Sequence, residues 1–478
     1  MSKDGKKRSE QRSVKGNGSG KTCQRIVWAD LLRQALTWAV HERIFEKIER
    51  HGNTSWLASQ LVGLAILWVW SDQSTLTGAF GEAKQLSLTM FGHVALTSYE
   101  GFSGALVTWT SRLLPLLWAH LHGLMELSGG EHWRIGRWLA LAVDGSRAST
   151  PRTKSNEAAF SAKNYGGSRT AKSRVRWRNK KRRSKRLPEP VKPQIWLTLI
   201  WHMGLRMPWC WKTGPSTSNE RDHFLDLLKS VVFPENTLFC CDAGFVGYDL
   251  WKTILDQGHQ LLIRVGGNVH LLRKLGWTQQ YENLVFLWPN KAARRGELPL
   301  VLRLLEFQGP RGKVYLVTSV LNGKSLPWQQ ASAMYKLRWG IELQFRSFKQ
   351  TFGRGKLRSR TADHALVELD WSLVGLWLLQ LFAAKEQIRI ASPPQRSSVA
   401  SALVVIHDAM RWGSTVVTDP RALARRFAAA VKDQYQRRSS KRARYQPDGK
   451  DKPSATKPRI IIATAAQRKA YHALATAS

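Results

Sequence analysis

Cysteine is scarce in this sequence: only Cys23, Cys210, Cys240 and Cys241 occur among 478 residues. So few thiols cannot form a disulfide framework for a chain of this length, and none has the CxxC spacing typical of zinc ligands. The pair Cys240–Cys241 is therefore expected to fill a buried strand. A secretory signal is also lacking, because residues 1–22 are basic and rich in Gly and Ser, with no apolar core. We therefore expect a cytoplasmic protein.

Apolar runs long enough to span a bilayer are lacking as well. The best candidate, Trp56–Trp70, is too short for a comfortable span, contains Gln60 and is followed closely by Asp72. We interpret it as a buried helix and expect no membrane partner. The sequence also has no P-loop motif and no HExxH pair, so neither ATP use nor that type of zinc site is indicated.

Acidic residues are few relative to basic ones: 34 Asp and Glu stand against 74 Lys and Arg, which gives a formal net charge of +40. Such an excess repels itself in a compact state and favours an acidic partner. Nucleic acid is the expected partner, because its phosphates release counterions to Lys and Arg. Apolar residues make up 43% of the chain and Trp is frequent, at 22, so the chain should fold. Its length predicts about two to four domains.

The pattern changes at residue 138 from helical periodicity to short apolar strands. Three consecutive strands are predicted at Trp138–Gly145, Ile195–Met203 and Met207–Gly214. Two helix–strand units follow, with strands at Asn236–Gly244 and residues 260–265. A hairpin-linked meander joined to parallel strands through helical crossovers is typical of an α/β fold.

The domain boundaries follow from these changes of pattern. The helices of the N-terminal region either recognise DNA or form a structural cap. We predict a disordered basic tail (1–22), a helical N-terminal region (23–130), the first part of an α/β domain (131–265, with a basic insert at 150–193), a β-rich insertion (266–328), the second part of the α/β domain (329–390) and a helical C-terminal region with a basic flexible end (391–478).

The basic insert contains a dense run of cations interrupted by one aromatic residue, Trp177. Ten Lys or Arg occur between residues 172 and 186. We expect this run to grip the DNA backbone without reading sequence, while a localisation-like or merely solubilising run is the alternative. The residues predicted to contact DNA are Lys172, Arg174, Arg176, Arg178, Lys180, Lys181, Arg182 and Arg183.

Two aspartates follow buried strands at Gly-containing turns, Asp144 in VDGS and Asp242 in CDAG. Ligands of open α/β sheets bind at the carboxyl ends of strands, although Asp is also a common turn former. A third acid, Glu342, lies within YKLRWGIELQFRSFK. Three such carboxylates in an intensely basic protein predict a divalent-cation site. Hard oxygen ligands favour Mg²⁺ or Mn²⁺, and a pair of ions suits phosphodiester exchange.

Glu342 is surrounded by basic residues at helical spacing. Each helical residue turns the chain by about 100°, which places Tyr335, Arg338, Arg346 and Lys349 on the same narrow face as Glu342. The acid could hold a cation while the bases hold phosphates on either side. A solvated helix face with ordinary Glu–Arg pairs is the alternative.

These motifs resemble the DDE transposases of the bacterial "insertion sequence four" family. That family carries a Tyr-(2)-Arg-(3)-Glu-(6)-Lys signature, which stands here as Tyr335, Arg338, Glu342 and Lys349. The sequences VDGS and CDAGFVGYDLW are similar to its first and second acid regions, and the resemblance covers roughly residues 138–390. Many relatives have a basic residue where this chain has Ala243, which puts one DNA contact in doubt.

The resemblance implies a ribonuclease H-like catalytic domain with a β-rich insertion and helical flanks. It implies that Asp144, Asp242 and Glu342 are catalytic and hold two Mg²⁺ or Mn²⁺ ions. Water would cut the transposon end, and the freed 3′ hydroxyl would attack target DNA. The resemblance also implies a homodimer that acts on double-stranded DNA with terminal inverted repeats, near the nucleoid. A nuclease without strand transfer and an idle DNA-binding descendant are the alternatives.

The resemblance also gives roles to residues around the acids. Tyr335, Arg338 and Lys349 would grip phosphates at the cleaved end, and Arg346 lies on the same predicted face. Some relatives pass through a DNA hairpin, which needs a base flipped onto an aromatic residue. Trp339 is a candidate for that contact, as are Trp277 and Trp288, and a place in the core is the alternative for each.

The basic run gives a first prediction. Deleting residues 172–186 should weaken DNA binding and flatten its salt dependence, because fewer phosphate counterions would be released. Fluorescence anisotropy with a labelled duplex at several salt concentrations measures the slope. An unchanged slope would eliminate the DNA-gripping role of this run.

Overall fold

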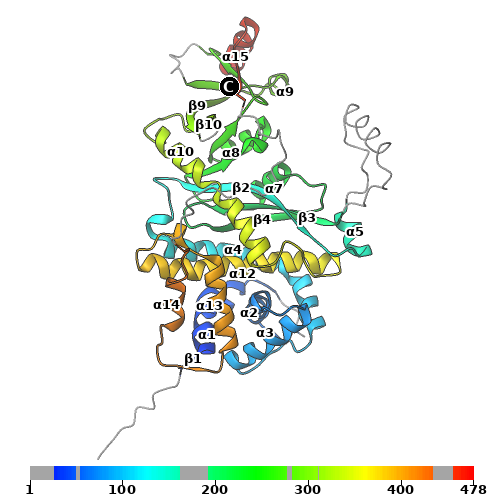
Figure 1. Cartoon of the computed structure of the whole chain (residues 1–478). Coiled ribbons are helices and arrows are strands. Elements are labelled where there is room, and N and C mark those ends of the chain that lie inside the picture. Colours follow the sequence, from blue (N-terminus) through cyan, green and yellow to red (C-terminus); the bar gives the residue numbers. More distant parts are fainter. Residues whose placement is uncertain are drawn as a thin grey trace, which may run out of the picture.

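A mixed sheet runs through the molecule, and a body of helices packs below its lower edge (Figure 1). The computed structural model describes residues 26–49, 54–161, 192–276, 283–309, 312–433 and 456–477. Among these residues the sheet has 10 strands in the order β12-β7-β8-β9-β10-β6-β5-β2-β3-β4. The α/β class expected from the sequence is therefore confirmed as a large mixed sheet with many helices.

The predicted meander and crossovers form the central part of the sheet. These strands are β2 (Leu139–Ser149), β3 (Gln194–His202), β4 (Met207–Gly214), β5 (Thr237–Cys241) and β6 (Gln260–Val265). Strand β3 is antiparallel to β2 and β4, whereas β5 is parallel to both β2 and β6. All residues of β5 are buried, as expected for an apolar strand inside a parallel pairing.

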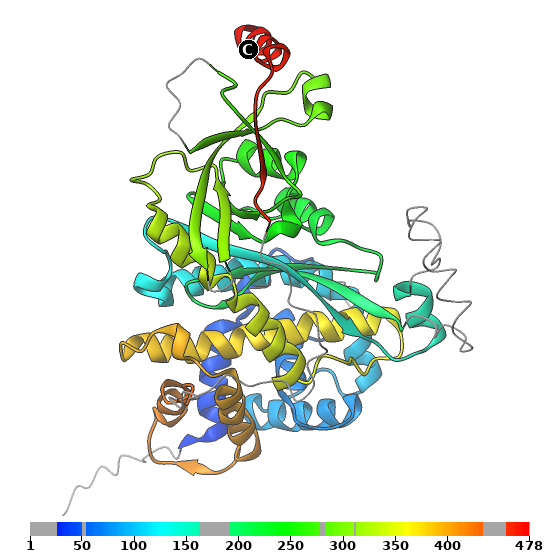
Figure 2. The ribbon, with the colours of Figure 1, turned by 45° about the horizontal axis from the view of Figure 1, so that its top comes forward.

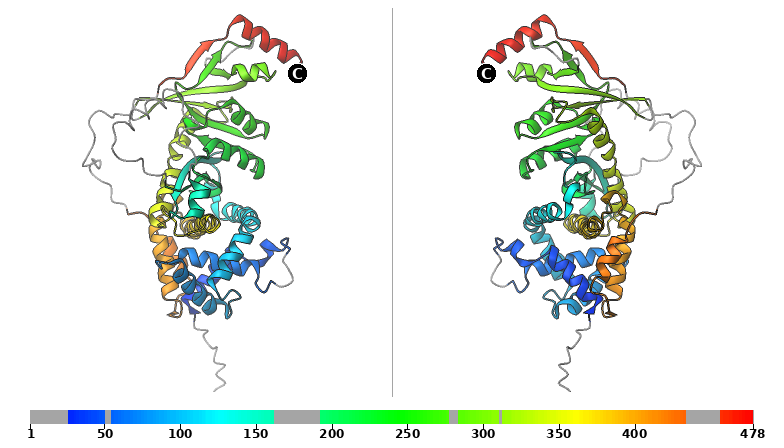
Figure 3. Two further views of the ribbon diagram at one scale, coloured as in Figure 1. Left: turned by 90° about the vertical axis from the view of Figure 1, so that its right-hand side faces the viewer. Right: turned by 90° about the vertical axis from the view of Figure 1, so that its left-hand side faces the viewer.

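Helices cover both faces of this central part (Figure 3). On one face lie α7 (Glu220–Ser230) and α8 (Tyr248–Asp256), and His223 of α7 is hydrogen-bonded to Thr198 of β3. On the other face lies α11 (Gly340–Arg346), where Gly340 packs against the indole of Trp201 so closely that a Cβ would approach it to 2.2 Å. Helix α7 begins at a fixed point, because Asn219 caps it by accepting a hydrogen bond from the Asp222 amide.

The β-rich region between residues 266 and 328 extends the same sheet. Its elements are β7 (His270–Arg273), β8 (Leu284–Leu287), α9 (Asn290–Arg294), β9 (Leu300–Gly309) and β10 (Gly312–Thr318). Strand β10 pairs antiparallel with β6, so the region continues the central sheet without a break in pairing. The sequence suggested an insertion but did not show this continuity.

The last described residues add one more strand to the sheet and a helix. Strand β12 (Arg459–Ile462) pairs in parallel with β7, and α15 (Ala465–Ala477) follows it. The stretch predicted to be flexible, residues 436–459, lies largely outside the described residues, and the strand at 459–462 was not predicted because it forms by pairing with the open edge of β7. Figure 2 shows this red segment returning along the upper part of the molecule.

The two helical flanks predicted at either end of the sequence form one body. Helix α12 (Ala362–Arg389) lies at its centre and contacts helices from both flanks. The strands β1 (Ile26–Val27) and β11 (Val416–Val417) also pair across the two flanks. The surrounding helices are α1 (Trp28–Ala39), α2 (Ala58–Trp70), α3 (Leu76–Phe91), α4 (Tyr99–Gly129), α13 (Val399–Arg411) and α14 (Ala422–Ala428).

The apolar composition of these helices serves burial in the core. Helix α12 is the one described helix that is long and apolar enough to cross a membrane, and 89% of its apolar window is buried. Helix α2 is also largely buried, in agreement with the interpretation of Trp56–Trp70. The remaining short elements are η1 (Glu42–Phe45), η2 (Gly130–His132), α5 (Lys154–Phe160), η3 (Ala243–Phe245), α10 (Trp328–Leu337), η4 (Ser347–Thr351) and η5 (Pro394–Arg396).

A buried carboxylate fixes the loop that follows η4 to the helical body. The side chain of Glu368 is 1% exposed. It accepts hydrogen bonds from the amides of Arg358 and Ser359 and from the Ser359 hydroxyl, at 2.7–3.1 Å. Nearby, Arg354 donates to Ser372 of α12 and to the carbonyl of Val69 in α2. The loop therefore connects the sheet-facing helix α11 with both helical flanks.

This network predicts a large loss of stability when Glu368 is truncated. Glu368→Ala should lower the free energy of unfolding by about 3–5 kcal/mol, because buried donors lose their charged acceptor. Chemical denaturation followed by circular dichroism measures the change. The control is Glu157→Ala, which removes a half-exposed pair with Arg152 and should cost about 1 kcal/mol or less. Equal effects of the two substitutions would contradict the role of Glu368.

Candidate active site

Asp144 and Asp242 occupy matching positions on neighbouring parallel strands. The register pairs Ala142 of β2 with Cys240 of β5, and each acid follows two residues later. Because alternate residues of a strand point to the same side, this register directs both carboxylates to one face of the sheet. Strand β5 stops at Cys241, whereas β2 continues beside β3. Asp144 therefore lies within a strand and not at its end, which corrects the prediction.

One oxygen of each aspartate is engaged locally. Oδ1 of Asp144 accepts a hydrogen bond from the Gly145 amide at 2.8 Å, and Oδ1 of Asp242 accepts one from the Gly244 amide at 2.8 Å. The turn-forming role of Asp is thus present at Asp242, which caps η3. The second oxygen of Asp144 faces the guanidinium of Arg338. Local hydrogen bonds therefore orient the carboxylates without using both of their oxygens.

The segment that contains Glu342 is a broken helix. Helix α10 ends at Leu337, α11 begins at Gly340, and the π-helical turn η4 begins at Ser347. The prediction of one continuous helix is therefore wrong, although the segment still crosses the sheet as one path (Figure 2). The break lies at Arg338 and Trp339. The side chain of Arg338 is buried, whereas that of Trp339 is exposed.

Arg338 lies between the first and third predicted acids. Its side chain is 9% exposed. Its Nη1 is 3.7 Å from Oδ2 of Asp144, and its Nη2 is 3.9 Å from Oε1 of Glu342. The guanidinium also lies 5.6 Å from the ring centre of Tyr335. One buried cation therefore holds together residues that are almost 200 positions apart in the sequence.

The three acids influence one another electrostatically. The pKa of Asp144 is raised to about 6, mainly by burial and also by the charges of Asp242 and Glu342, while the Gly145 amide and Arg338 oppose the shift. The negative charges of Asp242 and Glu342 are therefore close enough to act on Asp144. The structure thus brings the three predicted acids to one place, with a single buried arginine among them.

A fourth carboxylate, Glu220, lies at this place and was missed by the sequence reasoning. The pKa of Glu220 is raised to about 7, mainly by burial and also by the charges of Asp144 and Asp242, whereas Arg147 opposes the shift. Glu220 is the first residue of α7 and follows the capping residue Asn219. An acid in the first turn of the helix after the third strand was a signal in the sequence, but helix termini commonly carry such acids.

The chemistry of these side chains fits a divalent cation. The donors are all carboxylate oxygens, which Mg²⁺ and Mn²⁺ prefer, and the raised pKa of Asp144 reflects burial first and the charges of Asp242 and Glu342 second. In the part of the chain that the structure describes, however, no three His, Cys, Asp or Glu side chains are gathered closely enough to hold an ion as they stand. Ion binding would therefore require the carboxylates to move toward one another.

The other predicted contact residues of this segment differ in exposure. The hydroxyl of Tyr335 is buried without a hydrogen-bond partner, and Lys349 is half-buried, which lowers its pKa. Trp339 is 57% exposed, as a residue that contacts a ligand would be. Trp288 is buried in the core, where its indole donates to the Glu297 carbonyl.

Arg346 lies in α11 together with Glu342, one helical turn further along the chain. It is exposed and lines a pocket with Arg206 and Lys432, on the side of α11 that faces α12 and α13. The alternative of ordinary Glu–Arg pairs is met by Arg338, which lies 3.9 Å from Glu342, whereas no hydrogen bond or ion pair joins Arg346 to an acid among the described residues. Since Glu342 and Arg346 are four residues apart in one helix, they share a helical face, and the contact of Arg346 with DNA stays a prediction.

Some predicted residues lie outside the described ranges. Trp277 is one of them. The others are the cations of the basic insert, Lys172, Arg174, Arg176, Arg178, Lys180, Lys181, Arg182 and Arg183.

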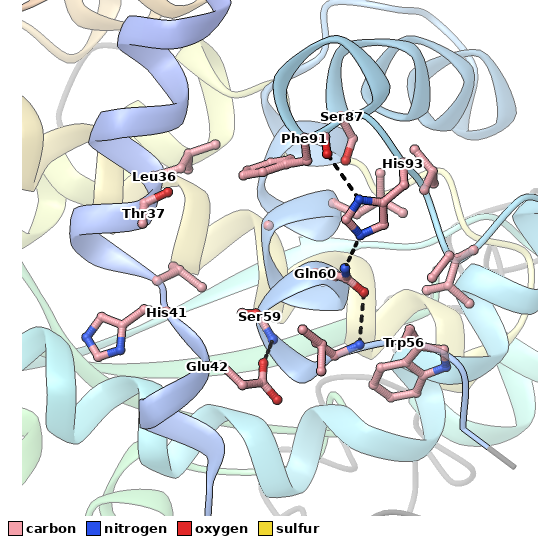
Figure 4. Close-up of a pocket in the computed structure, with 17 residues that line it drawn as sticks. Leu36, Thr37, His41, Glu42, Trp56, Ser59, Gln60, Ser87, Phe91 and His93 are labelled. Atoms are coloured by element: carbon pink, nitrogen blue, oxygen red, sulfur yellow. Dashed lines mark hydrogen bonds between the residues drawn. The ribbon is translucent and has the colours of Figure 1, made fainter.

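An apolar pocket in the helical body offers no alternative active site. Its volume is about 290 Å³, and it lies between α1, α2 and α3 (Figure 4). Its polar groups bond to one another: Glu42 accepts from the Ser59 amide, and Gln60 contacts His93 and accepts from the Leu57 amide. The carboxylate cluster beside Arg338 is therefore the stronger candidate for chemistry.

Comparisons with known proteins show which family the chain belongs to. A family model described as "Transposase DDE domain" matches residues 139–378. Over 269 residues the chain is 27% identical to "Transposase InsG for insertion sequence element IS4" of Escherichia coli (strain K12). That match covers 54% of each chain, so this chain spans about half the length of the curated relative. The "Cryo-EM structure of piggyBac transposase synaptic complex with hairpin DNA (SNHP)" is similar with a TM-score of 0.37 and 12% identity, over 88% of each chain.

The raised pKa of Asp144 predicts a pH-dependent effect of its removal. The folded pKa of about 6 lies above the usual value of 3.8, so ionisation costs stability as pH rises through this range, and nothing is lost below it. In EDTA, Asp144→Asn should therefore raise the free energy of unfolding at pH 8 by up to about 3 kcal/mol and leave it unchanged near pH 3.

Urea denaturation at both pH values measures this difference. Glu235→Gln is the matched control, because Glu235 is exposed and precedes the opposite end of β5. Destabilisation by Asp144→Asn at pH 8, or an equal gain from the control, would contradict the electrostatic description of the site.

Proposed function

Because this chain belongs to the transposase DDE domain family, we propose that it is a DNA transposase that moves an insertion sequence by cutting and pasting it. The family model extends over all three predicted acids. The contacts of Arg338 with Asp144 and Glu342 support a shared active site. Its substrates would be the inverted repeats at the ends of the element and the target DNA.

We propose that the catalytic domain is ribonuclease H-like. The strand order β4-β3-β2-β5-β6 supports this assignment, with an antiparallel meander on one side and two parallel strands on the other. The order places the first and fourth strands of this unit side by side. Their matching register then aligns Asp144 with Asp242.

Asp144, Asp242 and Glu342 would hold two divalent ions, Mg²⁺ or Mn²⁺. When bound, such ions supply the positive charge that activates the attacking oxygen and stabilises the leaving oxygen in phosphodiester exchange. The carboxylates contribute hard oxygen donors. Their negative charges repel one another, and a bound cation would reduce this repulsion. The half-exposed position of Glu342, whose side chain is 40% exposed, leaves the site open toward DNA.

The proposed reaction has two balanced steps. Water attacks a phosphorus atom at the transposon end, the bond from phosphorus to the 3′ oxygen breaks, and that oxygen leaves as a 3′ hydroxyl. The 3′ hydroxyl then attacks a phosphorus atom of the target and displaces another 3′ oxygen. Arg338 has buried N–H groups without hydrogen-bond partners, which suits it to bind a phosphate at this position. Tyr335, whose ring lies against the Arg338 guanidinium, and Lys349 would bind phosphates as well.

The protein would act as a homodimer on DNA, because both ends of an element must be held together. It would work in the cytoplasm, near the nucleoid. Trp339 and Arg346 would contact DNA outside the acid cluster, since both are exposed. The net charge of +40 suits this large polyanionic partner.

A cleavage and strand-transfer assay tests the proposal. The full chain is incubated with Mg²⁺ and a duplex that carries the DNA flanking its coding region, and the products are resolved on a gel. Asp144→Ala, Asp242→Ala and Glu342→Ala should each slow cleavage by at least about 10³-fold, because residues that act as a unit are each essential. DNA affinity should persist in all three.

Glu235→Ala serves as the control and should leave cleavage unchanged, since Glu235 is exposed and remote from the acids. Cleavage that survives in any of the three variants would refute the site assignment. Cleavage without joined products from the wild-type chain would indicate a nuclease, and DNA binding without cleavage would indicate an idle descendant.

A further inference from the structure

Glu220 lies against the glycines that accompany the two aspartates. A Cβ built on Gly145 would stand 2.4 Å from Cγ and 2.5 Å from Oε1 of Glu220. A Cβ on Gly244 would stand 3.0 Å from Oδ1 of Asp242 and 3.9 Å from Oε2 of Glu220. The Glu220 side chain therefore occupies space that any residue other than glycine would fill at position 145.

The sheet register shows from which side Glu220 approaches. Gly145 is paired with Thr198, so both point to the same face, and Thr198 contacts His223 of α7. Asp144 precedes Gly145 in the strand and therefore points to the opposite face, toward α11. Because Gly145 has no side chain, Glu220 can reach the sheet backbone between the two aspartates from the α7 side.

The position of Glu220 is fixed although no partner holds its carboxylate. Asn219 caps the helix by accepting from the Asp222 amide, and Arg221 donates to the Val246 carbonyl at 2.9 Å. Glu220 itself makes no hydrogen bond or ion pair with any residue of the described ranges, while Arg147 stacks over Trp196 at 4.4 Å. A purely structural carboxylate in a half-buried position would be expected to have such a partner.

A second, independent feature indicates that this place binds a ligand. Arg338 is 8% exposed, and its Nε and Nη1 have no hydrogen-bond partner. Its guanidinium faces Asp144 and Glu342 at 3.7 and 3.9 Å, which is too far for hydrogen bonds. Buried donors without acceptors are costly, so their retention favours an anionic ligand such as a phosphate at the acid cluster.

We propose that Glu220 is a fourth carboxylate of the divalent-cation site, acting together with Asp144 and Asp242. This inference rests on the proposed function of the same site. Two divalent ions carry more positive charge than three carboxylates carry negative charge, and hard cations take six or more oxygen ligands each. A fourth carboxylate beside Asp144 and Asp242 adds both charge and donors.

The test measures metal binding directly, by isothermal titration of Mn²⁺ into the full chain without DNA. Glu220→Gln should weaken Mn²⁺ binding at least about tenfold, the loss expected when a metal site loses a partner group. Glu235→Gln removes the same charge from the same domain and should bind Mn²⁺ as the wild type does. Circular dichroism and thermal melting establish that each variant is folded.

Equal Mn²⁺ affinity of Glu220→Gln and the wild type would overturn the inference. If Glu220→Gln does not fold, Glu220→Asp replaces it, because it keeps the charge on a side chain shorter by one methylene. Reduced Mn²⁺ affinity of Glu220→Asp would then support the inference, and unchanged affinity would overturn it.

Asp144→Asn separates the two hypotheses. Loss of Mn²⁺ binding in Asp144→Asn with intact binding in Glu220→Gln would leave the proposed function standing and overturn only the role of Glu220. Intact binding in both variants, or no binding by the wild type, would contradict the metal site of the proposed function as well.

Discussion

The in-register parallel pairing of β2 with β5 is the constraint on which the site depends. It aligns Ala142 with Cys240 and so places Asp144 beside Asp242, although 97 residues separate the two acids in the sequence. A slip by one residue would turn one carboxylate to the other face of the sheet. Every residue of β5 is buried, so both faces of this strand are covered in the structure.

The site keeps like charges together at a cost to stability. Burial and neighbouring acids raise the pKa of Asp144 to about 6 and that of Glu220 to about 7. Among the described residues only Arg338 makes ion pairs within this group, and its contacts are long, at 3.7 and 3.9 Å. In a chain of net charge +40 the scarcity of cations at this point is informative, because basic residues are plentiful elsewhere. A cluster of carboxylates that destabilises the fold by mutual repulsion, and that a bound cation would stabilise, is typical of functional sites.

Much of the central fold could be predicted from local patterns. Short apolar runs with turn residues at their ends predicted the positions of strands β2 to β6, since buried strands have a strong composition signal. The predicted ends of β2 and β5 differ from the observed ones. The spacing from Tyr335 to Lys349 suggested the family, which the family model confirms. Both inferences used residues that are close in sequence, where spacing alone is informative.

Features that depend on long-range pairing were not predictable in this way. The continuation of β2 past Asp144 requires β3 as a partner, and the strand at residues 459–462 exists because β7 offers an open edge. The break after Leu337 carries no Pro, so the periodicity predicted one helix. Glu220 was missed because only the three-dimensional contact with Gly145 distinguishes it from an ordinary acid in a first helical turn.

Anomalous X-ray scattering from crystals of the full chain grown with Mn²⁺ tests the central claim most directly. The account predicts manganese within about 2.0–2.6 Å of carboxylate oxygens from Asp144, Asp242 and Glu342, with these side chains drawn closer than they lie without metal. Manganese bound only elsewhere, with the three carboxylates still apart, would contradict it.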